Sequence, residues 1–479
     1  MSSSLVLYNS FTKKKEKFQS LSPKVVKMYV CGPTVYDLLH VGNFRGLIFF
    51  NVLRNWLEYL GYSVTYVYNY TDIDDKIIKK SKDENISAIE ISKKFINEFE
   101  KDFSLLKIPK ASFNPKCTDY IDDIVIFITD LINKKVAYEK KGSVFFSIDK
   151  FSNYGQLSGK NIEDLISGHR VNINPHKKNP IDFILWKPSK KDEPGWESPW
   201  GIGRPGWHIE CSVMSYSLLG DEIDIHGGGM DLIFPHHENE IAQSQSRFGK
   251  NFSKYWIHNN FIKFDDQKMS KSLGNIIKAR DFMNDYSPEI LKFIILSVHY
   301  RSPLNFNYYT IKQSILGLIR IYSALDFANK IVNENKNDFS EKSNIFILEF
   351  DKIILSMNHD INTPNVYATI FDVVRTFNSK LNNSITKSIA IDFISFFKKI
   401  GNLLGLFCEE PEKFLNQLNL ILLKEKEISL SKLQNEIKKR NKARQNKDYK
   451  EADLVRDNLL KLGIELKDSI NGTTWFVRI

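Results

Sequence analysis

The segment Val25-Val-Lys-Met-Tyr-Val-Cys31 opens the pattern that decides the fold. Its β-branched and aromatic residues predict a strand. Apolar residues at helical spacing follow from about residue 43 to residue 60, and residues 63–70 again form a strand pattern. Strand, helix and strand over this length predict a βαβ unit, and therefore a parallel sheet that binds ligands at the carboxyl ends of its strands.

The length and composition limit the class of protein. The chain has 479 residues, 42% of them hydrophobic, which predicts about two to four domains. No apolar run approaches the roughly 18–20 residues of a membrane span, and the N-terminus lacks the pattern of a secretory signal. Four scattered cysteines do not form a disulfide framework. We therefore expect a cytoplasmic protein without a membrane segment.

Patterning divides the chain into three expected domains. Residues 1–304 contain the βαβ unit and predict an α/β domain, with an insertion at about 110–200. Residues 305–423 are nearly all helix-period and predict a helical bundle. Residues 424–479 predict a small mixed α/β domain. The stretch 180–206 is rich in Trp, Pro and Gly, which suits either an ordered loop over a site or a structural surface loop.

The net charge of +10 permits a polyanionic partner, but lysine is spread along the whole chain. Only local clustering counts as evidence for nucleic acid. The run Lys438–Lys450 holds seven basic residues and one acid, with Arg440 and Arg444 four apart on one side of a helix. It is either a solvated helix face or a surface that contacts phosphates.

The stretch from His226-Gly-Gly-Gly to Pro235-His-His-Glu-Asn-Glu240 combines a glycine run with a helix start. Pro235 suits the first turn of a helix, where its missing N–H costs least. His236 and Glu240 are four residues apart and would lie on one helix face. A nitrogen donor and a carboxylate beside a glycine turn could form half of a metal site.

Two further loops could bind phosphate. His40 and Asn43 stand at the start of the expected helix 43–60, where backbone N–H groups and the helix dipole favour an anion. Gly42 lets a ligand approach the backbone closely. Histidines at helix starts are, however, most often ordinary caps or surface residues. The second loop, Lys268-Met-Ser-Lys-Ser272, could hold a polyphosphate by point charges and hydroxyls.

Together these segments resemble the class I aminoacyl-tRNA synthetases, and within them the cysteinyl-tRNA synthetases. His40-Val-Gly-Asn43 is similar to the first class I signature, although many members have a second histidine where this chain has Asn43. Lys268-Met-Ser-Lys-Ser272 matches the second signature letter for letter. Four more blocks are similar to the cysteine enzymes: Pro205-Gly-Trp-His-Ile-Glu-Cys-Ser212, Phe234-Pro-His-His-Glu-Asn-Glu240, Thr71-Asp-Ile-Asp-Asp-Lys76 and Gly472-Thr-Thr-Trp475. The resemblance implies a Rossmann-like catalytic domain.

The resemblance also implies one zinc ion at the base of the amino-acid pocket, held by Cys31, Cys211, His236 and Glu240. Zinc binds thiolate well, whereas a serine hydroxyl is a harder and weaker ligand. The alternative is a purely structural zinc site, in which all coordination positions are filled by the protein and the ion only links the loop to the helix. His237 and His208 are rival ligands, and the residues alone leave the choice between His236 and His237 open.

The reaction implied by the resemblance is the ATP-dependent attachment of L-cysteine to tRNA(Cys) through a cysteinyl-adenylate, with Mg²⁺ accompanying ATP. ATP would meet His40, Gly42, Asn43, Gly229, Asp231, Lys268 and Lys271, and cysteine would meet Cys31, Thr34 and Trp207. The end domain would read the anticodon, with Arg440, Arg444 and Trp475 as candidates for tRNA contact. The resemblance implies a monomer.

Two other functions remain as alternatives. A cysteine ligase with the same adenylating core could pass cysteine to a small-molecule amine. Such an enzyme would need no anticodon-binding end, whereas about 170 residues follow Asn305 here. A non-catalytic zinc protein could bind RNA, but it would have no use for the lysine loop at 268–272.

Overall fold

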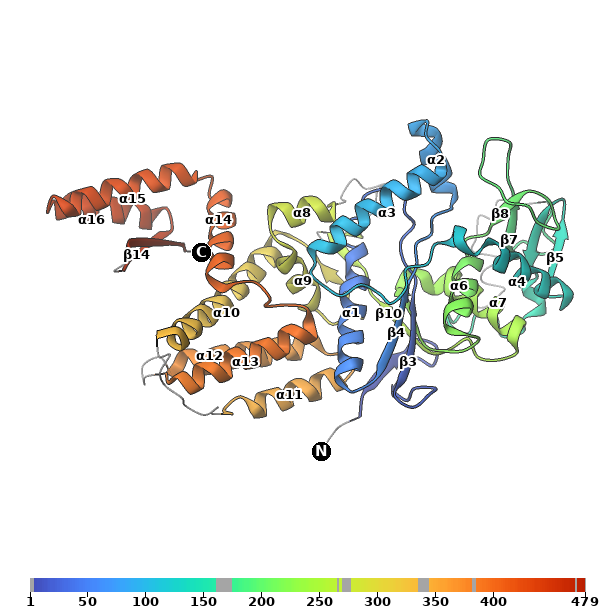
Figure 1. Cartoon of the computed structure of the whole chain (residues 1–479), viewed down its shortest axis with the longest axis horizontal. Coiled ribbons are helices and arrows are strands. Elements are labelled where there is room, and N and C mark those ends of the chain that lie inside the picture. Colours follow the sequence, from blue (N-terminus) through green and yellow to red (C-terminus); the bar gives the residue numbers. More distant parts are fainter. Residues whose placement is uncertain are drawn as a thin grey trace.

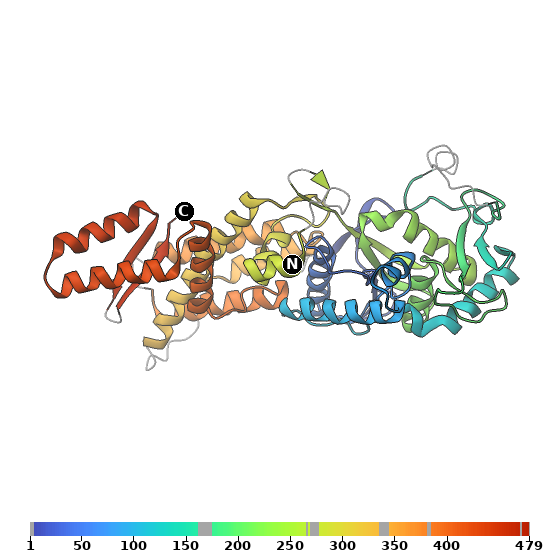
Figure 2. The same ribbon diagram turned by 90° about the horizontal axis from the view of Figure 1, so that it is seen from above.

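The computed structural model describes residues 4–160, 175–264, 267–268, 277–334, 344–380, 385–469 and 472–478. Within these residues the molecule is elongated (Figure 2), with a mixed α/β insertion at one end and the C-terminal helices at the other. The predicted Lys271 lies outside the described residues. None of the described helices is long and apolar enough to cross a membrane.

The central sheet has four parallel strands in the order β10-β9-β3-β4. The predicted βαβ unit is confirmed: β3 covers Val25–Val30, α1 covers Asn43–Tyr59 and β4 covers Ser63–Tyr68. β9 (Ile223–Gly229) and β10 (Ser253–Asn259) complete the sheet. Helix α1 is buried around most of its circumference, with Phe44, Phe50 and Trp56 fully buried, and packs against β4 and β10 (Figure 1).

Two helices near the sheet contribute to the site described below. They are α6 (Ile209–Leu219) and α7 (Glu238–Phe248), which contact each other. Short helical turns at Met230–Leu232 and Ile233–His237 lead from β9 into α7. Backbone angles after Phe234 are helical, so the helical path begins at Pro235, as the first-turn preference of proline predicts.

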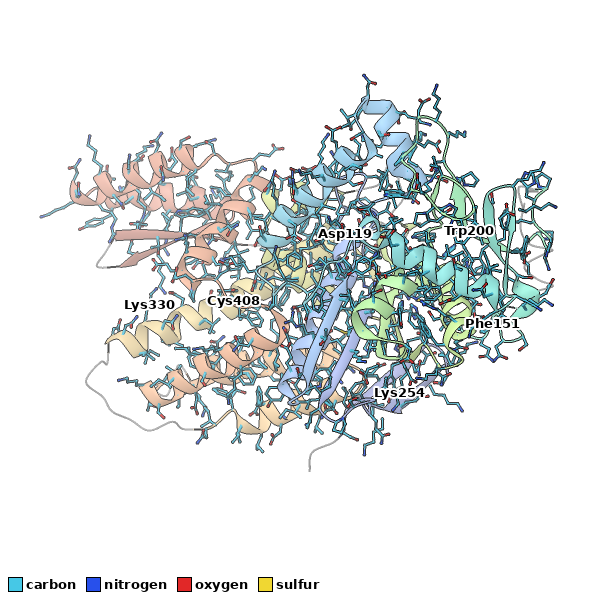
Figure 3. All side chains as sticks on the ribbon, turned by 45° about the vertical axis from the view of Figure 1, so that its right-hand side comes forward. Asp119, Phe151, Trp200, Lys254, Lys330 and Cys408 are labelled. Carbon is cyan, nitrogen blue, oxygen red and sulfur yellow. The ribbon has the colours of Figure 1, made fainter. Side chains whose placement is uncertain are left out.

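The insertion is built on an antiparallel sheet in the order β5-β6-β7-β8, with bounds Ala137–Lys140, Ser143–Phe146, Phe183–Pro188 and Gly203–Pro205. Residues 180–206 therefore contain two paired strands, and Trp186 is fully buried with its ring 6.0 Å from that of Trp200. This favours the structural interpretation of that stretch. Figure 3 labels Phe151 and Trp200 in this part of the molecule. Nearby helices are α2 (Asp75–Glu84), α3 (Ala88–Leu105) and α4 (Ile121–Asn133).

The segment before the helical bundle forms a small sheet in the order β12-β11-β13. β11 is Ile262–Phe264, β12 is Gln267–Lys268 and β13 is Leu304–Asn305. β10 and β11 follow each other closely in the chain but belong to different sheets. At the N-terminus, β1 (Val6–Asn9) and β2 (Lys14–Lys17) form a hairpin.

From residue 277 onward the described part of the chain is mainly helical, apart from β13 and a terminal strand pair. The helices are α8 (Ala279–Asp285), α9 (Pro288–Leu296), α10 (Tyr308–Glu334), α11 (Ile347–Asn358), α12 (Thr363–Ser379), α13 (Lys387–Leu404), α14 (Pro411–Glu425), α15 (Leu430–Gln445) and α16 (Tyr449–Lys461). β14 (Ile464–Ser469) pairs antiparallel with β15 (Gly472–Val477). Figure 1 shows this strand pair beside α15 and α16.

Candidate functional site

A cavity of about 430 Å³ opens at the carboxyl ends of the parallel strands, where ligands bind in open α/β sheets. Its wall includes the ends of β3, β9 and β10 and the start of α1. The predicted site residues among its lining are Cys31, Thr34, His40, Gly42, Asn43, Trp207, Cys211, Gly229, Asp231 and His236.

Four predicted ligands come together, and three of them line the cavity: one donor atom from each of Cys31, Cys211, His236 and Glu240 lies within 4.8 Å of all the others. The two thiol sulfurs are 3.6 Å apart. His236 Nε2 is 3.1 Å from Glu240 Oε1, as the i,i+4 spacing on a helix predicts. Cys31 Sγ is 3.6 Å from the same carboxylate oxygen.

Three different parts of the fold deliver these side chains. Cys31 follows β3, and its N–H donates to the carbonyl of Gly227 on the neighbouring strand β9 at 3.0 Å. Cys211 stands in the first turn of α6. His236 and Glu240 occupy the turn that leads into α7 and its beginning. The site therefore exists only when the sheet, α6 and α7 are packed together.

The two rival histidines have different surroundings. His208 Nδ1 lies 3.0 Å from His236 Nδ1, so His208 fixes the ring of His236 from behind. An imidazole that binds a metal through one nitrogen usually has its other nitrogen hydrogen-bonded in this way. His237 instead pairs its Nδ1 with His258 Nε2 at 2.8 Å. Its Nε2 is buried without a hydrogen-bond partner among the described residues.

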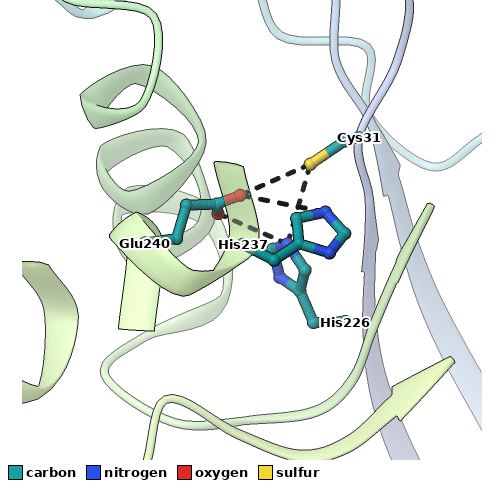
Figure 4. Close-up of side chains that lie close together, drawn as sticks. All are labelled: Cys31, His226, His237 and Glu240. Carbon is teal, nitrogen blue, oxygen red and sulfur yellow. Dashed lines mark hydrogen bonds and ion pairs between the residues drawn. The ribbon is translucent and has the colours of Figure 1, made fainter. Parts of the chain in front are cut away.

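A second possible ligand set shares two members with the first: Cys31, His226, His237 and Glu240 (Figure 4). His226 Nε2 is 3.6 Å from Cys31 Sγ and 3.3 Å from Glu240 Oε2. Sequence reasoning missed His226 as a possible ligand, although a histidine inside a buried parallel strand, just before a glycine run, was a usable signal. Only the first set contains both thiols.

Burial controls the protonation of the donor atoms. Removal from water raises the pKa of both thiols, Cys31 and Cys211, and lowers that of His236, while the hydrogen bond with Cys31 partly offsets the rise for Cys211. Neutral imidazole is the form that binds metals, and a bound cation favours the thiolates. Glu240 Oε2 is buried and accepts no well-directed hydrogen bond from a described residue. A buried carboxylate oxygen without a donor calls for a cation, so these residues fit zinc.

The side chains predicted to meet cysteine lie beside this cluster. The Trp207 ring stacks on the His236 ring, with centroids 4.5 Å apart and an angle of 27° between the planes. Trp207 is 38% exposed and belongs to the cavity lining. Thr34 forms a backbone bridge with Thr71, the residue at which the Thr71–Lys76 block begins.

Apart from the two lysines, the residues predicted to meet ATP also line the cavity. Asn43 Oδ1 accepts a hydrogen bond from the His40 N–H at 3.0 Å, which fixes the turn into α1. The segment around His40 also pairs with the chain that follows the lysine loop, since Val41 N–H donates to the Ile277 carbonyl at 3.1 Å. Lys268 ends β12, which pairs with β11.

The three residues proposed to contact tRNA differ in their availability. Arg440 is only 6% exposed, and its guanidinium holds both carboxylate oxygens of Asp468 at 2.9 and 2.8 Å. Arg440 therefore links α15 to β14 within the end domain. Arg444, whose side chain is 45% exposed, pairs with the same carboxylate at 2.6 Å. Trp475 is half-buried and packs against the core.

Comparison with known families covers most of the chain. Residues 17–315 match the family described as tRNA synthetases class I (C) catalytic domain, and residues 352–408 match the DALR domain. Among solved structures, the chain is similar to methionyl-tRNA synthetase of Mycobacterium tuberculosis in complex with methionyl-adenylate. The TM-score is 0.59 at 12% identity, over 84% of this chain and 91% of that chain.

Another structural relative is a putative arginyl-tRNA synthetase from Campylobacter jejuni, with a TM-score of 0.52 at 13% identity, over 80% of this chain and 93% of that chain. These two likenesses concern the fold alone. A relative in Bdellovibrio bacteriovorus, named cysteine--tRNA ligase, is 47% identical over 479 residues, which is 99% of both proteins. The chain therefore belongs to the cysteine--tRNA ligase family of class I tRNA synthetases.

Proposed function

We propose that the chain attaches L-cysteine to tRNA(Cys) in an ATP-dependent reaction of two steps. The cysteine carboxylate attacks the α-phosphate of ATP, which gives cysteinyl-adenylate and pyrophosphate. The terminal ribose hydroxyl of the tRNA then takes the cysteinyl group and releases AMP. The observation that carries this proposal is a single cavity whose lining includes Cys31, Cys211 and His236, three members of the possible metal-binding cluster, together with the His40–Asn43 turn. Membership of the family supports it.

Cys31, Cys211, His236 and Glu240 would hold a zinc ion. When bound, zinc would supply a thiophilic Lewis acid that accepts the substrate sulfur as thiolate. Serine and cysteine have almost the same shape, and a pocket that reads shape alone separates such pairs by only about 100-fold. The thiol-rich ligand set thus offers a chemical basis for choosing cysteine, because a serine hydroxyl is a poor ligand for this ion.

The chain's own residues would position and neutralise the phosphates, and neither step needs a protein nucleophile. His40 and Asn43 would donate hydrogen bonds from the start of α1, and Gly42 would let the phosphates come close. Lys268 and Lys271 would stabilise charge that develops on the pyrophosphate. Gly229 and Asp231 would lie against the adenosine, and Mg²⁺ would accompany the ATP.

Residues 1–304 would then form the catalytic domain, and residues 305–423 and 424–479 would hold the tRNA. In the end domain, Arg444 and Trp475 are better placed than the buried Arg440 to contact RNA directly. All four cysteines are free, which fits a reducing compartment such as the cytoplasm. We propose a monomer, as the family resemblance implies.

Amino-acid-dependent exchange of labelled pyrophosphate into ATP tests the first step directly. We expect exchange with cysteine and at least about 100-fold less with serine, and we expect a chelator that removes zinc to abolish the difference. Absence of cysteine-dependent exchange would contradict the proposal and favour a non-catalytic RNA-binding protein. Exchange without transfer of cysteine to tRNA(Cys) would instead favour a ligase with a small-molecule acceptor.

A further inference from the structure

Arg45, in the first turn of α1, is a buried cation that the proposed reaction does not use. It is 1% exposed. Among the residues that the structure describes, no carboxylate forms an ion pair with it. Burial lowers the pKa of Arg45 to about 10, which is still far above neutral pH, so the guanidinium remains charged. A buried charge without a counter-ion is costly unless hydrogen bonds compensate it.

The compensation comes from four backbone carbonyl groups on two other segments. One guanidinium nitrogen donates to the carbonyl of Phe261. The other donates to the carbonyl of Ser302 and, at 3.3 and 3.4 Å, to those of His299 and Tyr300. A planar fork with donors in fixed directions can join separate segments in this way, whereas a lysine offers all its donors from one atom.

The segments joined by Arg45 form two facing walls of the cavity. His40, Gly42, Asn43 and Gly46 line one wall, and residues 259–262 line the other. The second wall is itself tied to residues 300–301, because the Asn260 N–H donates to the Tyr300 carbonyl and its side chain donates to the Arg301 carbonyl, both at 2.8 Å. Hydrogen bonds therefore link three segments to one another: the start of α1 through Arg45, residues 260–261, and residues 299–302.

The two walls approach each other closely at Gly46. A Cβ atom placed on Gly46 would lie 2.9 Å from Asn259 Oδ1. Asn259 is 6% exposed, and this oxygen accepts no hydrogen bond from a described residue. The walls therefore leave no room for a side chain at Gly46 unless the Asn259 side chain moves.

We propose that Arg45 is a positioning residue that sets the distance between the two walls at the nucleotide end of the cavity. The inference rests on the proposed function, which assigns that end to ATP. Arg45 does not touch the reacting atoms. It acts through the start of α1 and through Phe261. Its hydrogen bonds to described residues go to backbone carbonyls outside the cluster around Cys211 and His236, so we expect that cluster to be unaffected.

A merely structural arginine would behave differently. Its loss would loosen the fold as a whole, so binding of cysteine, zinc and ATP would weaken together. Loss of a positioning residue changes the nucleotide end selectively, because misplacement of reacting groups by about 1 Å can slow a reaction about 100-fold. A change in the kinetic constants for ATP without a change in those for cysteine therefore indicates a positioning role, and a change in both indicates a structural role.

The test is Arg45→Lys, which keeps the length and the charge but cannot reach both segments. In cysteine-dependent pyrophosphate exchange we expect kcat/KM for ATP to fall about 10- to 100-fold. KM for cysteine and the zinc content should stay within about twofold of the unaltered protein. The matched control is Arg54→Lys on the same helix, because Arg54 pairs with Glu58 and the Lys110 carbonyl outside the cavity. The control should leave all constants unchanged.

Unchanged ATP kinetics in Arg45→Lys would overturn the proposal, and so would a parallel loss of cysteine binding and zinc. If Arg45→Lys does not fold, Gly46→Ala decides. Alanine is favourable in a helix, and the atom it meets belongs to a side chain. A selective loss in kcat/KM for ATP supports the proposal, whereas no loss or a general loss overturns it. The unaltered protein in the same assay reports on the proposed function separately.

Discussion

At the scale of single residues, the four cysteines have different surroundings. Cys31 and Cys211 face each other at 3.6 Å beside a buried carboxylate. Cys117 is buried elsewhere and Cys408 is exposed (Figure 3). Thiol chemistry in the cavity thus depends on two of the four side chains. Substitution of Cys31 or Cys211 alone should therefore weaken metal and substrate binding without a general loss of folding.

The first prediction concerns Cys211→Ser. Serine stays protonated and is a weaker ligand for zinc than thiolate. We expect the zinc content to fall well below one equivalent and the dissociation constant for cysteine to rise at least about tenfold, while ATP binding changes little. Metal analysis and ligand titration measure both effects, with Cys408→Ser as the matched control. Unchanged cysteine affinity in a metal-depleted variant would remove the recognition role.

The second prediction concerns Lys271→Ala in the second signature. Loss of a charge that stabilises the leaving pyrophosphate should slow adenylate formation by about 100- to 1,000-fold, with little effect on the melting temperature. Rapid-quench measurement of adenylate formation gives the rate. Lys254→Ala on β10 serves as a control, because this lysine lies over the Tyr255 ring and is not part of the cavity lining (Figure 3). An unaltered rate for Lys271→Ala would withdraw the assignment.

At the scale of elements, the basic run at the end of α15 is partly internal. Arg440 and Arg444 both pair with Asp468 on β14, and Thr473 on β15 donates its hydroxyl hydrogen to the same carboxylate at 2.8 Å. The run is therefore neither a wholly solvated face nor a free phosphate-binding surface. Its arginines first join a helix to a strand pair, and the remaining lysines face outward.

The third prediction follows from this pairing. The Arg440 guanidinium and the Thr473 hydroxyl hold the pKa of Asp468 well below its usual range. A carboxyl with a depressed folded-state pKa stabilises the fold above its unfolded pKa of about 4, and the contribution disappears as pH falls through the folded pKa. Asp468→Asn should therefore lower the melting temperature at pH 7, and the difference from the unaltered protein should shrink as pH falls from 5 toward 2.

The matched control for that experiment is Glu465→Gln on the same strand. It removes the same charge, but its partner Arg478 and its own side chain are 66% and 52% exposed, and such surface pairs contribute little. Calorimetry at several pH values compares the two variants. An equal effect of both substitutions, or an effect of Asp468→Asn that grows at low pH, would contradict the structural role of the pair.

At the scale of the whole molecule, the parallel sheet and the terminal helices α15 and α16 lie far apart along the long axis (Figures 1 and 2). Asp360 joins the parts between them. Its buried carboxylate accepts from the Tyr8 N–H, the Tyr300 hydroxyl and Arg301 Nε. The first strand, the segment before α10 and the helical bundle thus meet at one residue, whereas the end domain after α14 makes fewer connections to the rest.

The fourth prediction tests this separation. A chain that ends at Lys426, the C-cap of α14, should keep cysteine-dependent pyrophosphate exchange within about twofold, because the cavity is complete without the end domain. Its kcat/KM for transfer to tRNA(Cys) should fall at least about tenfold, since contacts with RNA phosphates are lost. Aminoacylation assays on both chains measure the difference. Undiminished charging of tRNA would show that the end domain is dispensable.

The sequence by itself determined what depends on short spacing. Backbone periodicity predicted the βαβ unit and the shared face of His236 and Glu240, because neighbours within a few residues are placed by local geometry. Tertiary structure alone decided the rest. It brings Cys31 to Cys211, which is 180 residues away, and His226 to Cys31. It also pairs Arg440 with Asp468 and places the Arg45 guanidinium against the carbonyl groups of two other segments. These contacts depend on how sheet and helices pack and on which charges are buried, and no short-range pattern encodes that.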